Sequence, residues 1–115
     1  MCDKPLGMED ERILDEQITA SSEFDPVTHG VLNSRLNHVA GNGVRGAWIV
    51  ANGDSDVNQW IQVDLRASKL VSGIVLQGRE DNDQWVSTYK VAYSDDGNSF
   101  QDVTDTNNAA MVSLN

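Results

Sequence analysis

The 115-residue chain has one cysteine, two prolines and no long apolar run. One thiol can form neither an internal disulfide nor a thiolate metal cluster, so any disulfide of Cys2 needs a partner outside this sequence. The longest wholly apolar run, residues 47–51, is far shorter than the roughly 20 residues of a membrane-spanning helix. The N-terminus has no signal-peptide core, so if this domain works outside a cell, its export signal is expected upstream of this chain.

Positive charge is also scarce. Eight Lys and Arg residues against 18 Asp and Glu residues give a net charge of −10, and the basic residues are scattered along the chain. This acidic field repels nucleic acid and anionic lipid head groups, so neither is expected as a partner. The length predicts a single domain, and 39% hydrophobic residues suffice for a packed core.

Alternating apolar and polar residues predict strands rather than helices. Strands are expected near residues 60–65, 70–78, 86–94 and 99–103. The almost continuous apolar run 70–78 is typical of a strand covered on both faces. Tight turns are expected at Asn42-Gly43, Asn52-Gly53 and Asp95-Asp96-Gly97-Asn98. Residues 8–18 are interpreted as a loop or one turn, and the predicted fold class is all-β, a sandwich or jelly roll.

Five spaced segments carry a resemblance to a known family. They are "CDKPLGMED...I...QITASS" (2–22), "SRLN......GAW" (34–48), "NQWIQVDL" (58–65), "VSGIVLQGR" (71–79) and "WVSTYKVAYSDDGNSF" (85–100). In this order they resemble the F5/8 type C domain, also called the discoidin domain. The resemblance implies a distorted jelly-roll barrel of about eight main strands, with ligand-binding loops at one end.

The resemblance also bears on completeness. Members of the family close with further strands and a terminal cysteine that are not found before Asn115. Residues 1–115 are therefore expected to be one discoidin domain truncated at its C-terminal end, without the cysteine that would pair with Cys2. The resemblance places such a domain in a larger extracellular protein, secreted or at the cell surface.

Large and charged side chains divide between core and loops. Trp60 lies in the regular alternation of residues 60–65 and is interpreted as core. Arg35 and Asp64 are interpreted as a buried charge pair that fixes the barrel. Trp48 and Trp85 adjoin loops, so stacking on a sugar ring and ordinary packing are both open for them.

The candidate ligand site lies on the loops that the family uses for binding. Arg79 offers a planar donor fork beside acceptors such as Glu80 and Asp83, which suits a neutral, hydroxylated ligand. Among these loops, residues 23–32 are expected to expose an aromatic ring and a histidine. The complete set of candidate ligand-binding residues is Phe24, His29, Trp48, Asn52, Asp54, Arg79, Asp81 and Trp85.

Metal and catalytic sites find little support in the sequence. Residues 54–65 begin like an EF-hand calcium loop, but Gln59 replaces the required glycine and Leu65 the bidentate glutamate. A looser calcium site at Asp81 or Asp83 is kept as an alternative, and no other cofactor is expected. No serine–histidine–acid arrangement is present, and the loop acids lack the apolar pockets that raise a carboxyl pKa.

The sequence thus predicts a non-catalytic extracellular recognition or adhesion module that binds galactose-type carbohydrate or glycoprotein. The nearest alternative is a receptor ectodomain module whose acidic loops receive a basic peptide. The resemblance also allows attachment to phosphatidylserine membranes, which the acidic loops oppose. A fourth alternative is an accessory module of a secreted hydrolase.

Overall fold

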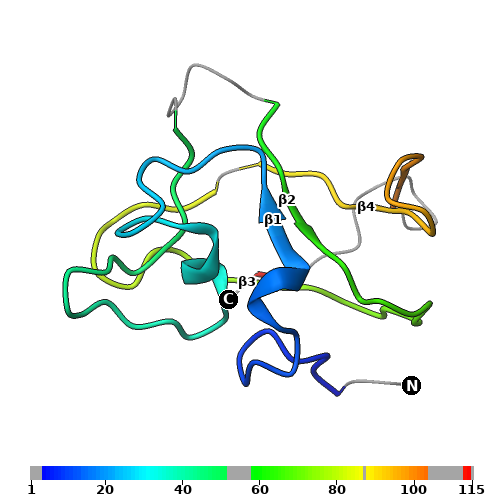
Figure 1. Cartoon of the computed structure of the whole chain (residues 1–115), viewed down its shortest axis with the longest axis horizontal. Helices are drawn as coiled ribbons and strands as arrows, with labels where there is room; N and C mark the ends of the chain where they lie inside the picture. The colour runs from blue at the N-terminus through cyan, green and yellow to red at the C-terminus, as the bar shows by residue number, and fades with distance from the viewer. Residues whose placement is uncertain (1–3, 52–57, 87, 104–112, 115) are drawn as a thin grey trace.

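The computed structural model describes residues 4–51, 58–86, 88–103 and 113–114 (Figure 1). Short elements alternate with long loops: η1 (Asp15–Gln17), β1 (Ile18–Ala20), η2 (Val31–Ser34), β2 (Ile61–Val63), β3 (Val75–Leu76), β4 (Ala92–Tyr93), β5 (Gln101–Asp102) and β6 (Ser113–Leu114). Both helices are 3-10 turns, and the described residues contain no helix able to cross a membrane. The strand-dominated structure agrees with the predicted all-β class.

The strands pair two by two. β1 lies antiparallel to β2, β3 parallel to β6, and β4 antiparallel to β5. Each of these strands is two or three residues long, so backbone ladders alone give the structure little regular sheet. Much of the long-range order in the described residues therefore comes from hydrogen bonds between loops.

The β1–β2 pair joins distant parts of the chain. Its ladder continues at both ends, because the Ser21 N–H donates to the Trp60 carbonyl (2.9 Å) and the Asp64 N–H to the Gln17 carbonyl (2.8 Å). β2 lies within the strand predicted at residues 60–65. β1 was not assigned from the sequence, because three residues are too few to show an alternation above their surroundings.

A small core lies beside this pair. Ile18 is 4% exposed, and Ile13 is also buried. The buried Gln17 amide accepts a hydrogen bond from the Leu14 N–H (2.9 Å) and donates one to the Asp64 carbonyl (2.7 Å). Because both ends of the amide have partners, its burial avoids the cost of an unsatisfied polar group.

The hairpin predicted around residues 95–98 joins β4 to β5. Gly97 has a φ of 76°, the left-handed conformation that the turn signal predicted. Asp96 holds the turn by accepting hydrogen bonds from the backbone N–H groups of Ser99 (2.9 Å) and Asn98 (2.8 Å). These bonds, with that of Ser99 the largest cause, lower the pKa of Asp96 to about 2.

The Asn42-Gly43 turn is also confirmed. Both residues have positive φ, 53° and 81°, and a bridge joins Gly41 to Val44 across them. These dihedrals belong to the mirror-image turn that suits the twist of antiparallel strands. The Asn52-Gly53 turn lies outside the described residues.

Burial after residue 58 differs from the prediction. Trp60, interpreted as core, is 49% exposed, and Leu70, in the run expected to be covered on both faces, is 85% exposed. The regular strand within that run is only Val75–Leu76. Alternation shows which side chains share a face, but a face is buried only where a second layer covers it. None of the described residues in 58–103 is buried.

The predicted pair of Arg35 with Asp64 is also wrong. The largely buried Arg35 guanidinium donates to Asp15 Oδ1 (2.7 Å) and to the Met8 carbonyl (2.8 Å). Asp64 instead accepts from the backbone N–H of Arg66 (2.8 Å). The sequence indicated a paired arginine, but the choice of acid depends on how the N-terminal segment folds back.

Two matched truncations test this distribution of burial. Ile18→Ala should lower the free energy of unfolding by about 2–5 kcal/mol, because it leaves a cavity among buried groups. Leu70→Ala should change it by less than about 0.5 kcal/mol, because that side chain makes few contacts. Urea unfolding of both variants measures the difference, and a large loss at Leu70 would show that the 70–78 run is covered after all.

Candidate functional site

Three segments that lie together on the left of Figure 1 contain most of the candidate binding residues. We call them the first loop (residues 23–30), the middle segment (residues 44–49) and the acidic loop (residues 79–85). The middle segment is no regular strand, so its backbone groups are available to both neighbours. It therefore acts as the shared support of the two loops.

Backbone hydrogen bonds join the first loop to the middle segment. The Phe24 N–H donates to the Ile49 carbonyl (2.7 Å), and the Ile49 N–H donates to the His29 carbonyl (3.2 Å). The Arg45 N–H donates to the Thr28 carbonyl (2.8 Å). These bonds fix both ends of the loop against one partner.

Inside the first loop, Asp25 supports the backbone turn. Its Oδ1 accepts hydrogen bonds from the N–H groups of Val27 (2.9 Å) and Thr28 (3.3 Å). These bonds, that of Val27 first, lower the pKa of Asp25. The Phe24 ring, 63% exposed, meets the His29 ring edge-on at 5.1 Å. The loop thus presents one aromatic ring to solvent in a fixed orientation.

The acidic loop is bound to the other side of the support. Asp81 Oδ1 accepts a hydrogen bond from the Gly46 N–H (3.0 Å). Glu80 Oε2 accepts one from the Ala40 N–H (3.1 Å). Two of the acids that make this loop so polar are therefore acceptors for backbone groups that no strand satisfies.

Arg79 closes the acidic loop from within. Its Nε donates to Asp81 Oδ1 (2.6 Å) and its Nη1 to Gln84 Oε1 (2.7 Å). The side chains of Arg79 and Asp81 are 10% and 24% exposed. Bonding to Arg79, aided by the Gly46 N–H, lowers the pKa of Asp81 to about 2. In this arrangement Arg79 braces the loop, and direct contact with a ligand stays a prediction.

The two tryptophans left open by the sequence differ in the structure. Trp48 is half-buried, and its Nε1–H donates to the Ser22 carbonyl (2.8 Å), which favours packing. Trp85, at the end of the acidic loop, is 72% exposed. Its ring is therefore the larger free aromatic surface of the two.

Six of the eight candidate residues lie on the three joined segments, whereas Asn52 and Asp54 lie outside the described residues. Two supporting residues were not predicted from the sequence. Gly46 leaves no room for a side chain, and Asn33, which is buried, donates from Nδ2 to the Thr28 carbonyl (3.0 Å). A glycine in an apolar stretch was a signal for close backbone approach. Nothing in the sequence pointed to Asn33.

The calcium alternative gains no support from these positions. Within the described part of the chain no three His, Cys, Asp or Glu side chains gather where they could hold a metal ion. Asp81 is engaged with Arg79, and Asp83 lies on the same exposed loop. Calcium binding at either residue stays a prediction.

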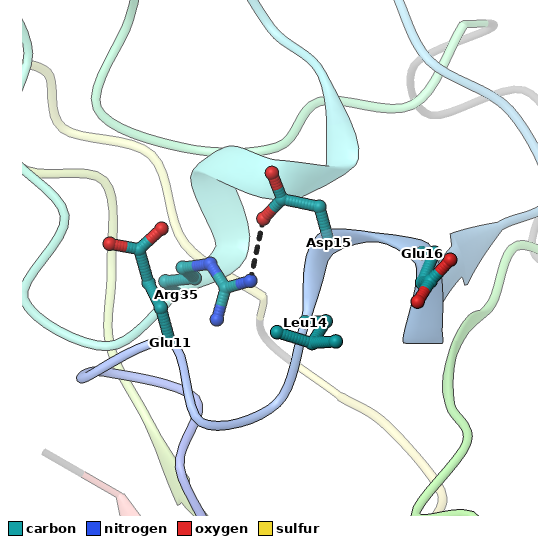
Figure 2. A pocket seen from close by; sticks show the side chains of 5 residues that line it. All are labelled: Glu11, Leu14, Asp15, Glu16 and Arg35. Atoms are coloured by element: carbon teal, nitrogen blue, oxygen red, sulfur yellow. Dashed lines mark hydrogen bonds and ion pairs between the residues drawn. The ribbon is translucent and has the colours of Figure 1, made fainter.

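A separate hollow of about 340 Å³ lies between η1 and η2, lined by Glu11, Leu14, Asp15, Glu16 and Arg35. Figure 2 shows the Arg35 guanidinium between Glu11 and Asp15, with its hydrogen bond to Asp15 dashed. A second hollow of about 510 Å³ shares Glu11, Asp15 and Arg35 and extends to Glu9 and His38. None of the six candidate residues that the structure describes lines either hollow, and among the described lining residues acids outnumber the single arginine.

A strand-dominated scaffold with exposed aromatic rings on braced loops is typical of a recognition module. Comparison with known proteins identifies which one. The family model of the F5/8 type C domain matches residues 17–115. The chain belongs to this family, which confirms the discoidin β-sandwich fold class and makes the chain a binding module of extracellular type.

Several curated proteins are similar to the chain. The mouse EGF-like repeat and discoidin I-like domain-containing protein 3 is 43% identical over 103 residues, which cover 84% of this chain and 20% of that protein. Rat lactadherin is 38% identical over 100 residues, which cover 84% of this chain and 23% of lactadherin. Mouse retinoschisin is 39% identical over 97 residues, which cover 81% of this chain and 41% of retinoschisin. The chain thus spans about two-fifths or less of each of these relatives.

The junction of the two loops can be tested at Gly46. A Cβ there would lie 2.7 Å from Asp81 Oδ1 and 3.0 Å from Glu80 Cβ, whereas one at Gly41 would meet nothing within 4 Å. Gly46→Ala should cost about 1–3 kcal/mol of unfolding free energy, as overpacking does. It should also speed hydrogen–deuterium exchange in residues 79–85. Gly41→Ala is the control, and equal effects of the two variants would contradict the described junction.

The Arg79–Asp81 pair also predicts an acid response. Because the pKa of Asp81 is lowered from 3.8 to about 2 in the folded chain, its stabilising effect is complete above about pH 4 and is lost as the pH falls through 2. The protection of residues 79–85 from hydrogen–deuterium exchange, relative to the intrinsic exchange rate at each pH, should fall over that interval. Asp81→Asn should show the faster exchange already at neutral pH, and a wild-type-like acid response in that variant would rule out Asp81 as the cause.

Proposed function

We propose that the chain is a non-catalytic extracellular recognition module that binds galactose-type carbohydrate, free or on a glycoprotein, through the three joined segments. The observation that carries this proposal is the exposure of Phe24 and Trp85 on loops fixed to one support. Sugars pack their C–H faces on aromatic rings and need a few fixed donors and acceptors around them. Asn52 and Asp54, which lie outside the described residues, stay candidate ligand-binding residues on the sequence alone.

Electrostatics favours a neutral ligand over an anionic membrane. Asp25, Glu80 and Asp81 lie on the two loops, with Arg79 already paired to an acid. Each acid near an anionic lipid surface should oppose binding by about as much as a basic residue helps, roughly 1 kcal/mol. We therefore expect no binding to phosphatidylserine vesicles at physiological salt.

The absence of catalysis is part of the proposal. General acids that work near neutral pH need carboxyl pKa values raised by apolar surroundings. Asp25 and Asp81 have lowered pKa values instead, because they accept hydrogen bonds from backbone or arginine donors. An accessory role beside a hydrolase would then leave the chemistry to another domain of the parent protein.

A second candidate function is recognition of a basic peptide. The hollows around Arg35 support it, because they combine acids such as Glu9 and Glu11 with apolar side chains such as Leu32 and Leu36. The aliphatic part of a lysine or arginine can pack on the apolar surface, while its charged head group lies near the acids. The site differs from the loops that the sequence suggested for such a partner.

The proposed module is part of a larger extracellular protein. It is further proposed to be one discoidin domain. Leu70 and Val71 expose apolar side chains on a face that a covering layer would bury. A longer version of the chain that supplies such a layer should therefore unfold at a higher denaturant concentration.

Binding is tested by titrating the chain with galactose-terminated glycans, glucose-terminated glycans, phosphatidylserine vesicles and an oligoarginine peptide. We expect binding to the galactose-terminated ligands and none to the vesicles in about 0.15 M salt. Vesicle binding with a silent glycan array would overturn the proposal. Binding of the peptide alone would select the second candidate.

Matched aromatic substitutions locate the site. Trp85→Ala and Phe24→Ala should each weaken glycan binding by about tenfold, which corresponds to about 1.4 kcal/mol of lost contact. Trp60→Ala and Phe100→Ala remove rings that are about half exposed and lie outside the three segments, and they should leave affinity unchanged. Equal losses in all four variants would indicate a general effect on the fold instead of a site.

Arg79→Ala should abolish glycan binding, because the acidic loop loses the hydrogen bonds from Arg79 to Asp81 and Gln84. Gly46→Ala separates bracing from direct contact, since it disturbs the same loop and keeps the guanidinium. If Arg79 acts by bracing, both variants lose binding together with slow exchange in residues 79–85. Loss of binding in Arg79→Ala with unchanged exchange would instead assign the guanidinium to the ligand.

A further inference from the structure

The Asn42-Gly43 turn has a feature that the proposed function does not use. Both residues are exposed, and the region where a Gly43 Cβ would lie has no atom within 4 Å. Among the described residues nothing holds the Asn42 side-chain amide or the Gly43 N–H, because the two turn hydrogen bonds join Gly41 and Val44 instead. The two groups that can react with each other are therefore both unengaged.

Three other asparagines in the described residues are buried or held by hydrogen bonds. Asn37 is bonded through its side chain to Glu9 and Gln77, and Asn33 is buried. The Asn82 Oδ1 accepts from the N–H of Asp83, the nitrogen that cyclisation would need. Within the described part of the chain, Asn42 is also the one asparagine that precedes a glycine.

We propose that Asn42 is a site of spontaneous deamidation. The Gly43 backbone nitrogen loses its proton and attacks the Asn42 side-chain carbonyl carbon, so that a C–N bond forms and ammonia leaves. Glycine permits this approach because no Cβ stands beside the nitrogen. Water then opens the cyclic imide at either carbonyl and yields aspartate or isoaspartate. The only co-reactant is water.

The modification changes the surroundings of the acidic loop. Isoaspartate inserts one more carbon into the backbone, so a two-residue turn no longer keeps Gly41 opposite Val44. Either product adds a carboxylate between Ala40 and Gly46, whose N–H groups hold Glu80 and Asp81. Like charges then oppose the contact that positions the acidic loop. Any consequence for glycan binding rests on the proposed function, whereas the deamidation does not.

The test is peptide mapping of the folded chain after incubation at mildly alkaline and mildly acidic pH. Trypsin releases residues 36–45 as one peptide, separate from the peptides that contain Asn52, Asn82 and Asn98. We expect conversion at Asn42, faster at alkaline pH, with isoaspartate detected by a carboxyl methyltransferase. Its rate should lie within about tenfold of that in the free 36–45 peptide, because so small a turn opens readily.

Two variants complete the test. Asn42→Gly retains the turn and removes the reactive amide, so slow exchange in residues 79–85 should persist through the incubation. Asn42→Asp adds the carboxylate without the extra backbone carbon. It therefore separates the effect of the added charge from that of the lengthened backbone. An intact Asn42 amide in the folded chain, while the free peptide converts, would overturn the proposal. Conversion with unchanged exchange in residues 79–85 would overturn its structural consequence.

Discussion

The arrangement of the candidate site depends on the backbone of one segment that forms no regular strand. Residues 44–49 form no regular strand, yet their N–H and carbonyl groups are used by the first loop on one side and by the acidic loop on the other. A buried side chain adds to this support, since Asn33 Nδ2 donates to carbonyls of both Thr28 and Ala47. Because both loops depend on the same segment, a change at Gly46 should be felt by the whole face.

The β1–β2 pair and Arg35 give this support a fixed position. β1 follows η1 directly, and η1 contains Asp15, the acid paired with Arg35 at the end of η2. The N-terminal segment is therefore bound to β2 on one side and to η2 on the other. A largely buried guanidinium would be costly without its partner. The pair thus sets the position of η2 and, through Asn33, that of the first loop.

The sequence predicted the elements whose signals are local. Alternation located β2 and β5, and Asp-Gly and Asn-Gly dipeptides located two turns, because their positive φ values depend on a few neighbouring residues. Burial was predicted less well. Trp60 and Leu70 follow strand patterns but are exposed, since burial requires a covering layer that alternation cannot supply. The choice of Asp15 over Asp64 likewise depends on tertiary arrangement. The family resemblance located the loops and so the candidate residues on them. The residues that hold these loops in place, Gly46 and Asn33, were identified only from the structure.

The acidic composition of the loops has a structural cause. Loops without a sheet partner leave backbone N–H groups unsatisfied, and carboxylates are strong acceptors for them. Glu23 accepts from Val31, Glu80 from Ala40 and Asp81 from Gly46. These charges are thus turned toward the protein backbone, and Arg79 neutralises one of them at the centre of the acidic loop. A ligand approaching the face meets exposed aromatic rings edged by oriented carboxylates. That combination suits the hydroxyl groups and C–H surfaces of a neutral sugar better than it suits an anionic membrane.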